Sequence, residues 1–166
     1  LADINGLDYK SVSNACKLVG YDVCFRAGIK GYKPVEGINP DSDTIENIVI
    51  MLKRSLAFWR EYGPITKVGF TFEGGYTDIV SSGDGDYLTN DTLWDFKVSK
   101  GELRSKDTLQ LLMYYIMGYH SIHPKFKKIE KLGIFNPRKN KVYIANISLI
   151  NPETIEKVSK DIIGYK

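Results

Sequence analysis

Three polar side chains stand close together in the middle of the chain, in a stretch that otherwise has the pattern of β-strands. Asp86 precedes a turn at residues 89–91, and Asp95 and Lys97 follow it. Because strand side chains alternate between two faces, Asp95 and Lys97 share one face, and a hairpin would bring Asp86 beside them. Two carboxylates suit Mg²⁺ or Mn²⁺, and an ammonium group beside them could orient a water or offset charge on a phosphate. The pattern therefore indicates metal-dependent chemistry at a phosphodiester.

Simpler interpretations exist for the same residues. The Asp95 and Lys97 side chains could form an ordinary ion pair on a solvated strand face. The upstream acid is also open to choice, since Asp78 and Asp84 precede Asp86 by a few residues. We favour Asp86 because a direct hairpin partner is the simplest route to a shared site.

The helix expected after this hairpin, over residues 106–119, carries Gln110 and Tyr114 one turn apart on the same face. Both side chains could therefore contact one group on the neighbouring strand. A structural alternative exists for Gln110, because Asp107 as N-cap with a glutamine three positions later forms a capping box.

These residues resemble the PD-(D/E)XK nuclease superfamily, in which a metal-binding Asp is followed by a D/E-x-K triplet on the next strand. The triplet here is Asp95-Phe96-Lys97, and Asp86 matches the upstream acid. Gln110 and Tyr114 match the subset related to bacterial recombination and phage exonucleases. The sequence-specific likeness covers residues 83–115, and the order of elements extends it to about residues 65–150. One departure is Gly85, which precedes Asp86 where the family name has a proline.

The resemblance implies an α/β fold with a central mixed sheet of four to five strands flanked by helices, as in a restriction-endonuclease-like core. It implies hydrolysis of a phosphodiester, in DNA rather than RNA, by a water activated on Mg²⁺, with Mn²⁺ as substitute. Asp86, Asp95 and the carbonyl of Phe96 would hold the metal, and Lys97 would position the water, steadied by Gln110 and Tyr114. The alternative is a catalytically silent module that binds nucleic acid or a protein partner.

Glu46 is a candidate third metal ligand, because the family often places a Glu on the helix before the sheet. Its alternative role is to complement the dipole of that helix from the first turn.

Composition agrees with a single domain, residues 1–166, made of an extension (1–40) and a core (41–166). The chain begins with Leu rather than Met, so it could be a fragment of a longer protein. The net charge of +3 permits nucleic acid as a partner without naming it. Basic residues gather over 125–141, which suits either a phosphate-binding surface or a solvated face. Dimerisation and protein partners stay open.

Two cysteines without zinc-ligand spacing, and the lack of an apolar run of membrane length, favour a cytoplasmic location.

Periodicity and turn signals predict the remaining elements. In order, they are a helix over 7–19 that stops at Gly20, a loop over 26–40, a helix from 41–43 to 62, a strand over 65–73, the hairpin 83–99, the helix 106–119, a hairpin over 129–148 and a closing helix after Asn151. The helix that ends at residue 62 is expected to cross the sheet with a stripe of six apolar residues: Ile45, Ile48, Val49, Leu52, Leu56 and Trp59. The stripe of the closing helix is Ile155, Val158 and Ile162.

Overall fold

A computed structural model describes residues 3–32 and 34–166 of the chain. The backbone divides into two compact units, Leu1–Ser55 and Leu56–Lys166. The division into an extension, residues 1–40, and a core, residues 41–166, within one domain stays a prediction. No helix within the described residues combines the length and the hydropathy that a membrane span requires.

The first unit contains helix α1 (Tyr9–Ala27) and the N-terminal part of helix α2 (Ser42–Tyr62). The predicted stop of α1 at Gly20 is wrong, since the helix continues to Ala27. A Cβ atom at Gly20 would lie 2.4 Å from Cδ1 of Ile38. This glycine therefore permits a close approach of another segment and does not terminate the helix.

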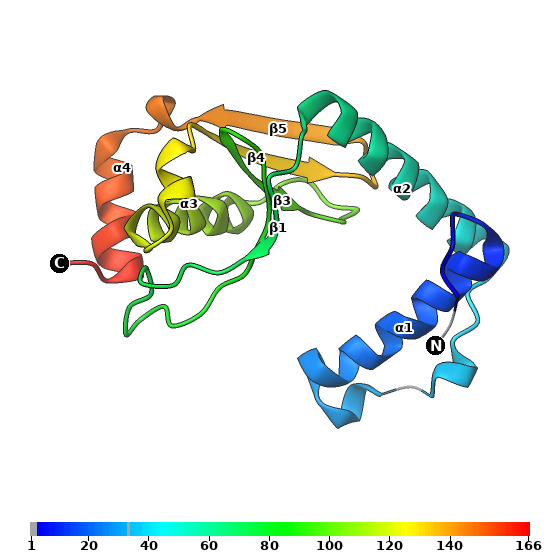
Figure 1. The fold of residues 1–166 in the computed structure, drawn as a ribbon. Coiled ribbons are helices and arrows are strands. Elements are labelled where there is room, and N and C mark those ends of the chain that lie inside the picture. Colours follow the sequence, from blue (N-terminus) through cyan, green and yellow to red (C-terminus); the bar gives the residue numbers. More distant parts are fainter. Residues whose placement is uncertain (1–2, 33) are drawn as a thin grey trace. The chain divides into compact units, whose positions relative to one another are not determined.

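The second unit is built on a five-stranded mixed sheet, which confirms the predicted α/β class (Figure 1). Its strands follow the chain order and are β1 (Lys67–Phe70), β2 (Gly85–Leu88), β3 (Thr92–Phe96), β4 (Lys131–Asn136) and β5 (Lys141–Asn146). Both predicted hairpins are present, as the antiparallel pairs β2–β3 and β4–β5. Strands β3 and β4 are parallel, because helix α3 (Ser105–His120) carries the chain back between them.

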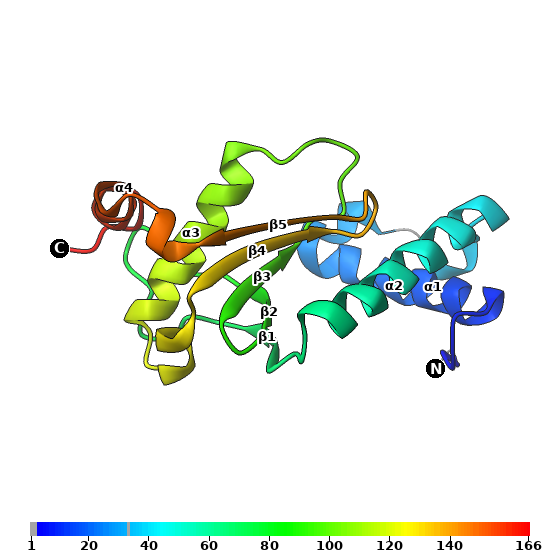
Figure 2. The same ribbon diagram turned by 90° about the horizontal axis from the view of Figure 1, so that it is seen from above.

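The two faces of the sheet bury different residues. On one face Leu93, Leu132 and Ile134 pack with α3 and with helix α4 (Pro152–Lys157), which Figure 2 shows beside the strands. On the other face Trp94 and Phe135 pack against Phe58, near the end of α2. The end of α2 therefore packs on the sheet, through Trp59 of the predicted stripe and through Phe58, which the stripe omitted. The stripe is wrong at Leu52 and Leu56, which are exposed.

The closing helix departs from its predicted stripe at one position. After α4 the chain forms a π-helix, Val158–Ile163, whose wider turn holds an extra residue. As a result Ile163 is fully buried, whereas the predicted Ile162 is 41% exposed.

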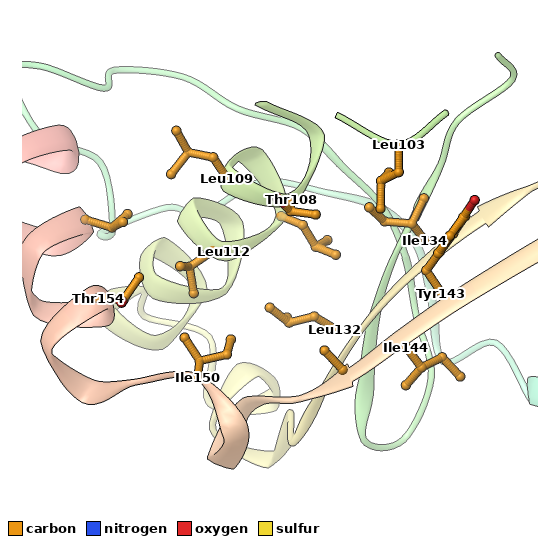
Figure 3. A pocket seen from close by; sticks show the side chains of 13 residues that line it. Leu103, Thr108, Leu109, Leu112, Leu132, Ile134, Tyr143, Ile144, Ile150 and Thr154 are labelled. Carbon is orange, nitrogen blue, oxygen red and sulfur yellow. The ribbon is translucent and has the colours of Figure 1, made fainter. Parts of the chain in front are cut away.

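A cavity of about 450 Å³ lies between α3, β4, β5 and α4 (Figure 3). Its walls are mainly aliphatic and include Leu109, Leu112, Leu132, Ile134, Ile144 and Ile150. None of the described residues that line it is acidic or basic. This cavity therefore lacks the groups that hydrolytic chemistry requires.

Candidate active site

The β2–β3 hairpin brings the two predicted carboxylates to facing positions. Tyr87 pairs with Trp94 and Leu88 with Leu93, and the same antiparallel register continued by one residue sets Asp86 opposite Asp95. Facing side chains in an antiparallel pair lie on the same side of the sheet. Asp86 Oδ2 also accepts a hydrogen bond from the Phe96 backbone nitrogen at 2.8 Å, which holds this carboxylate against β3.

Asp95 is a buried carboxylate, with 6% of the residue exposed. Its Oδ2 atom lies 3.0 Å from Lys97 Nζ, yet among the described residues it accepts no hydrogen bond of acceptable geometry. Burial raises the pKa of Asp95, and the charges of Asp86 and Asp107 act in the same direction. Lys97 opposes this increase in the pKa without cancelling it. Asp95 thus has an unsatisfied oxygen in a place where a negative charge is costly.

Lys97 is held by a chain of side-chain contacts from α3. Its Nζ donates to Gln110 Oε1 at 2.8 Å, and Gln110 Nε2 donates to the Tyr114 hydroxyl at 2.8 Å. Since an ammonium group only donates, Gln110 must turn its carbonyl oxygen toward Lys97, which leaves its NH₂ for Tyr114. The Tyr114 ring in turn packs against Phe72, with ring centroids 5.0 Å apart. The structure therefore brings together Lys97, Gln110 and Tyr114.

The alternative of a capping box with Asp107 and Gln110 is wrong. Arg104 is the N-cap of α3, and Asp107 Oδ2 accepts from the Arg104 backbone nitrogen at 3.0 Å. This bond is the main reason why the pKa of Asp107 is lowered. Gln110 is therefore free to bind Lys97.

Asp107 lies close enough to influence the site, and the sequence interpretation missed this. Together with Lys97, Ser99, Arg104, Lys106 and Gln110 it lines a polar pocket of about 440 Å³. Asp107 stands three residues before Gln110, and this spacing could have indicated its place beside the site, because residues three apart share a helix face.

The rival upstream acids lie elsewhere. Asp78 and Asp84 are exposed in the segment between β1 and β2, and neither is among the charges that shift the pKa of Asp95. Asp86, in contrast, is half-buried and acts on Asp95 directly. The glycine before it has a packing role, because a Cβ atom at Gly85 would lie 2.0 Å from the Phe70 ring.

Glu46 lies in the first compact unit, exposed on α2. The five other predicted side chains all belong to the second unit. The role of Glu46 as a metal ligand stays a prediction, as does that of the Phe96 carbonyl.

The donors of Asp86 and Asp95 fit a small hard cation. Within the described residues no group of three or more His, Cys, Asp or Glu side chains is placed to hold a metal ion. Mg²⁺ differs from most protein-bound metals in needing one or two carboxylates while keeping several waters. The unsatisfied Oδ2 of Asp95, facing Asp86, is the kind of oxygen ligand that such an ion requires.

Comparison with known proteins adds no relative: no family model, curated protein or solved structure matches the chain.

Proposed function

We propose that the protein is a metal-dependent nuclease of the PD-(D/E)XK type, which hydrolyses phosphodiester bonds in DNA rather than RNA. One observation carries this proposal. Lys97 Nζ lies 3.0 Å from Asp95 Oδ2 and 2.8 Å from Gln110 Oε1, and the charge of Asp86, opposite Asp95 in the hairpin, acts on the Asp95 carboxylate. A restriction-endonuclease-like core is part of the proposal, since the acid lies on β2, the triplet at the end of β3 with Lys97 directly after it, and the Gln/Tyr pair on α3.

The residues of the chain have distinct roles in the proposed reaction. Asp86 and Asp95 would hold Mg²⁺, which when bound lowers the pKa of a coordinated water and neutralises charge on the phosphate. Lys97 directs its ammonium group at the developing negative charge or at the attacking water. Gln110 and Tyr114 restrict the position of Lys97, so that little reorganisation is required during the reaction.

The hydrolysis needs no covalent intermediate on the protein. The water oxygen bonds to phosphorus and releases a proton to solvent. The bond to the leaving oxygen breaks at the same time, and that oxygen takes up a proton from solvent. The free thiols of Cys16 and Cys24 support a reducing, cytoplasmic setting for this activity.

A catalytically silent module that binds nucleic acid or a protein partner is the second candidate. The observation in its favour is that the described residues contain no group of three metal-ligating side chains.

Cleavage assays separate these two functions. We expect the wild type to cleave plasmid or linear DNA with Mg²⁺ or Mn²⁺ and to be inactive in EDTA. Lys97→Ala should lower kcat by about a hundredfold or more, since it removes a preorganised charge. Gln110→Ala should have a smaller effect, because Lys97 stays present but is less restricted. Lys100→Ala, an exposed lysine of the following loop, is the matched control and should leave kcat unchanged.

Cleavage that persists in both EDTA and Lys97→Ala would contradict the proposal. Binding of DNA without cleavage under any divalent metal would instead assign the protein to the silent-module class.

A further inference from the structure

The polar pocket beside Lys97 has an excess of positive charge. Three cationic side chains, those of Lys97, Arg104 and Lys106, line it together with one carboxylate, that of Asp107. The Arg104 side chain is 66% exposed, and its Nε lies 3.7 Å from Asp107 Oδ2. Lys106 also lines the pocket, and its charge helps to lower the pKa of Asp107. The guanidinium and one ammonium group are therefore available to an incoming anion.

The walls of the pocket are fixed by hydrogen bonds within the chain. Asn136, which is buried, donates from Nδ2 to the Ser99 carbonyl at 2.8 Å. The Gly101 backbone nitrogen donates to Ser99 Oγ at 3.0 Å, and Arg104 is held by Asp107 through its backbone. These contacts order the loop between β3 and α3. Arg104, at the end of this loop, and Lys106, in the first turn of α3, are exposed.

The chemistry of the walls selects one kind of ligand. No aromatic ring is among the described residues that line the pocket, so it offers no platform for stacking a nucleobase. Guanidinium and ammonium groups bind phosphate oxygens through charge-assisted hydrogen bonds. Of the cations that line the pocket, Lys97 is paired with Asp95 and Arg104 with Asp107, so the positive charge in excess is that of Lys106.

We propose that this pocket binds a phosphate group of the nucleic-acid strand adjacent to the bond that is cleaved, through Arg104 and Lys106. The inference rests on the proposed function, because Lys97 and Gln110 belong both to the pocket and to the proposed site. Arg104 and Lys106 would then orient the nucleic-acid strand relative to Lys97. The phosphate is either an internal phosphodiester or a terminal phosphate, and both present non-bridging oxygens that accept from guanidinium and ammonium groups.

Equilibrium binding in EDTA tests the pocket without requiring cleavage. The probe is a single-stranded DNA oligonucleotide labelled with fluorescein at its 3′ end, titrated by anisotropy over a series of salt concentrations. The variants are the wild type, Arg104→Gln/Lys106→Gln, and the control Lys128→Gln/Lys157→Gln, which removes the same charge from exposed lysines elsewhere. We expect the pocket variant to bind roughly tenfold more weakly. The slope of log Kobs against log salt should fall in magnitude by about 1.4, since each lost contact with a single strand contributes about 0.7.

Comparison of oligonucleotides with a 5′-phosphate and a 5′-hydroxyl identifies the source of the phosphate. A loss confined to the 5′-phosphorylated probe assigns a terminal phosphate, and an equal loss for both assigns an internal one. Equal affinities and slopes for the pocket and control variants would overturn the inference. That result is distinct from failure of the proposed function, because a protein that binds through the pocket without cleaving DNA fails only the cleavage assay.

Discussion

Asp95 combines two features that rarely occur together in a structural residue. Its carboxylate is buried, and one of its oxygens accepts no hydrogen bond from the described part of the chain. A buried carboxylate with an unsatisfied oxygen lowers the stability of a fold, and such groups are typical of binding and catalytic sites. The nearby ammonium group of Lys97 compensates in part, but it is itself shared with Gln110.

The raised pKa of Asp95 gives a prediction about stability and pH. Because the folded state binds the proton more tightly than the unfolded state, the contribution of Asp95 to the free energy of unfolding is greatest below the ordinary pKa of aspartate. It then falls as the pH rises through the higher folded pKa, by about 1.4 kcal/mol for each unit of difference. Asp95→Asn should remove this contribution and be more stable than the wild type at neutral pH. Urea unfolding at several pH values, in EDTA, measures the difference between the two proteins.

The matched control is Asp84→Asn, which neutralises an exposed aspartate close in sequence. Curves of stability against pH that run parallel for the wild type and Asp95→Asn would contradict the burial of a charged carboxylate at this position.

At the scale of elements, the aromatic cluster behind the site sets the position of β3. Phe58 stacks on Phe135 with ring centroids 4.2 Å apart and meets Trp94 edge-on at 4.7 Å. Trp94 lies between Leu93 and Asp95, so its side chain is on the face of β3 opposite to the site. The aromatic cluster packs against that face. Phe58→Ala should therefore lower the free energy of unfolding by about 3–5 kcal/mol.

Both tryptophans of the chain, Trp59 and Trp94, belong to this cluster, so intrinsic fluorescence reports its unfolding directly. The control is Leu56→Ala on the same helix, where the side chain is 53% exposed and the expected change is within about 0.5 kcal/mol. Similar losses for the two variants would exclude a specific role for the Phe58 contacts.

Patterns within each segment predicted the helices and strands. The details that were predicted wrongly depend on contacts between segments that are far apart in sequence. Turn residues between runs with strand character predicted both hairpins. The end of α1 could not be predicted, because the role of Gly20 depends on Ile38, which is far away in sequence. The shift from Ile162 to Ile163 depends on a π-helix, which leaves no periodic signal in a short segment.

In the candidate site, too, local spacing could be predicted and contacts between distant segments could not. The spacing of Asp95, on β3, and Lys97, directly after it, is local and could be predicted, as could that of Gln110 and Tyr114 on one helix. The contact between Lys97 and Gln110 joins the strand to the helix, and the register of the hairpin sets Asp86 opposite Asp95. The N-cap of α3 was wrongly assigned to Asp107. The N-cap is Arg104, whose backbone nitrogen donates to Asp107 Oδ2, and arginine is not a residue type that predicts an N-cap.

Across the whole molecule, the late basic residues do not form one free surface. Lys131 pairs with Asp91 at 2.7 Å, and Lys139 and Lys141 both contact Glu102. Such exposed pairs contribute little to stability, but they reduce the positive charge that a phosphate would meet. Contact with nucleic acid is therefore expected to depend more on the pocket with Arg104 and Lys106 than on the lysines over 131–141.

The stability of the whole chain should respond to the cation that the site is proposed to hold. A ligand that binds only the folded state stabilises it by about 2.7 kcal/mol at a hundred times its Kd, which for a chain of this size is roughly 5–10 °C in Tm. We expect Mn²⁺ to raise Tm by this order in differential scanning fluorimetry, and EDTA to reverse the increase. Asp86→Asn and Asp95→Asn should lose it, whereas Asp78→Asn and Asp84→Asn should keep it. If the increase in Tm with Mn²⁺ persists in Asp95→Asn, or is lost in Asp78→Asn, the cation binds away from the β2–β3 hairpin. The buried Asp95 is then left without its proposed ligand.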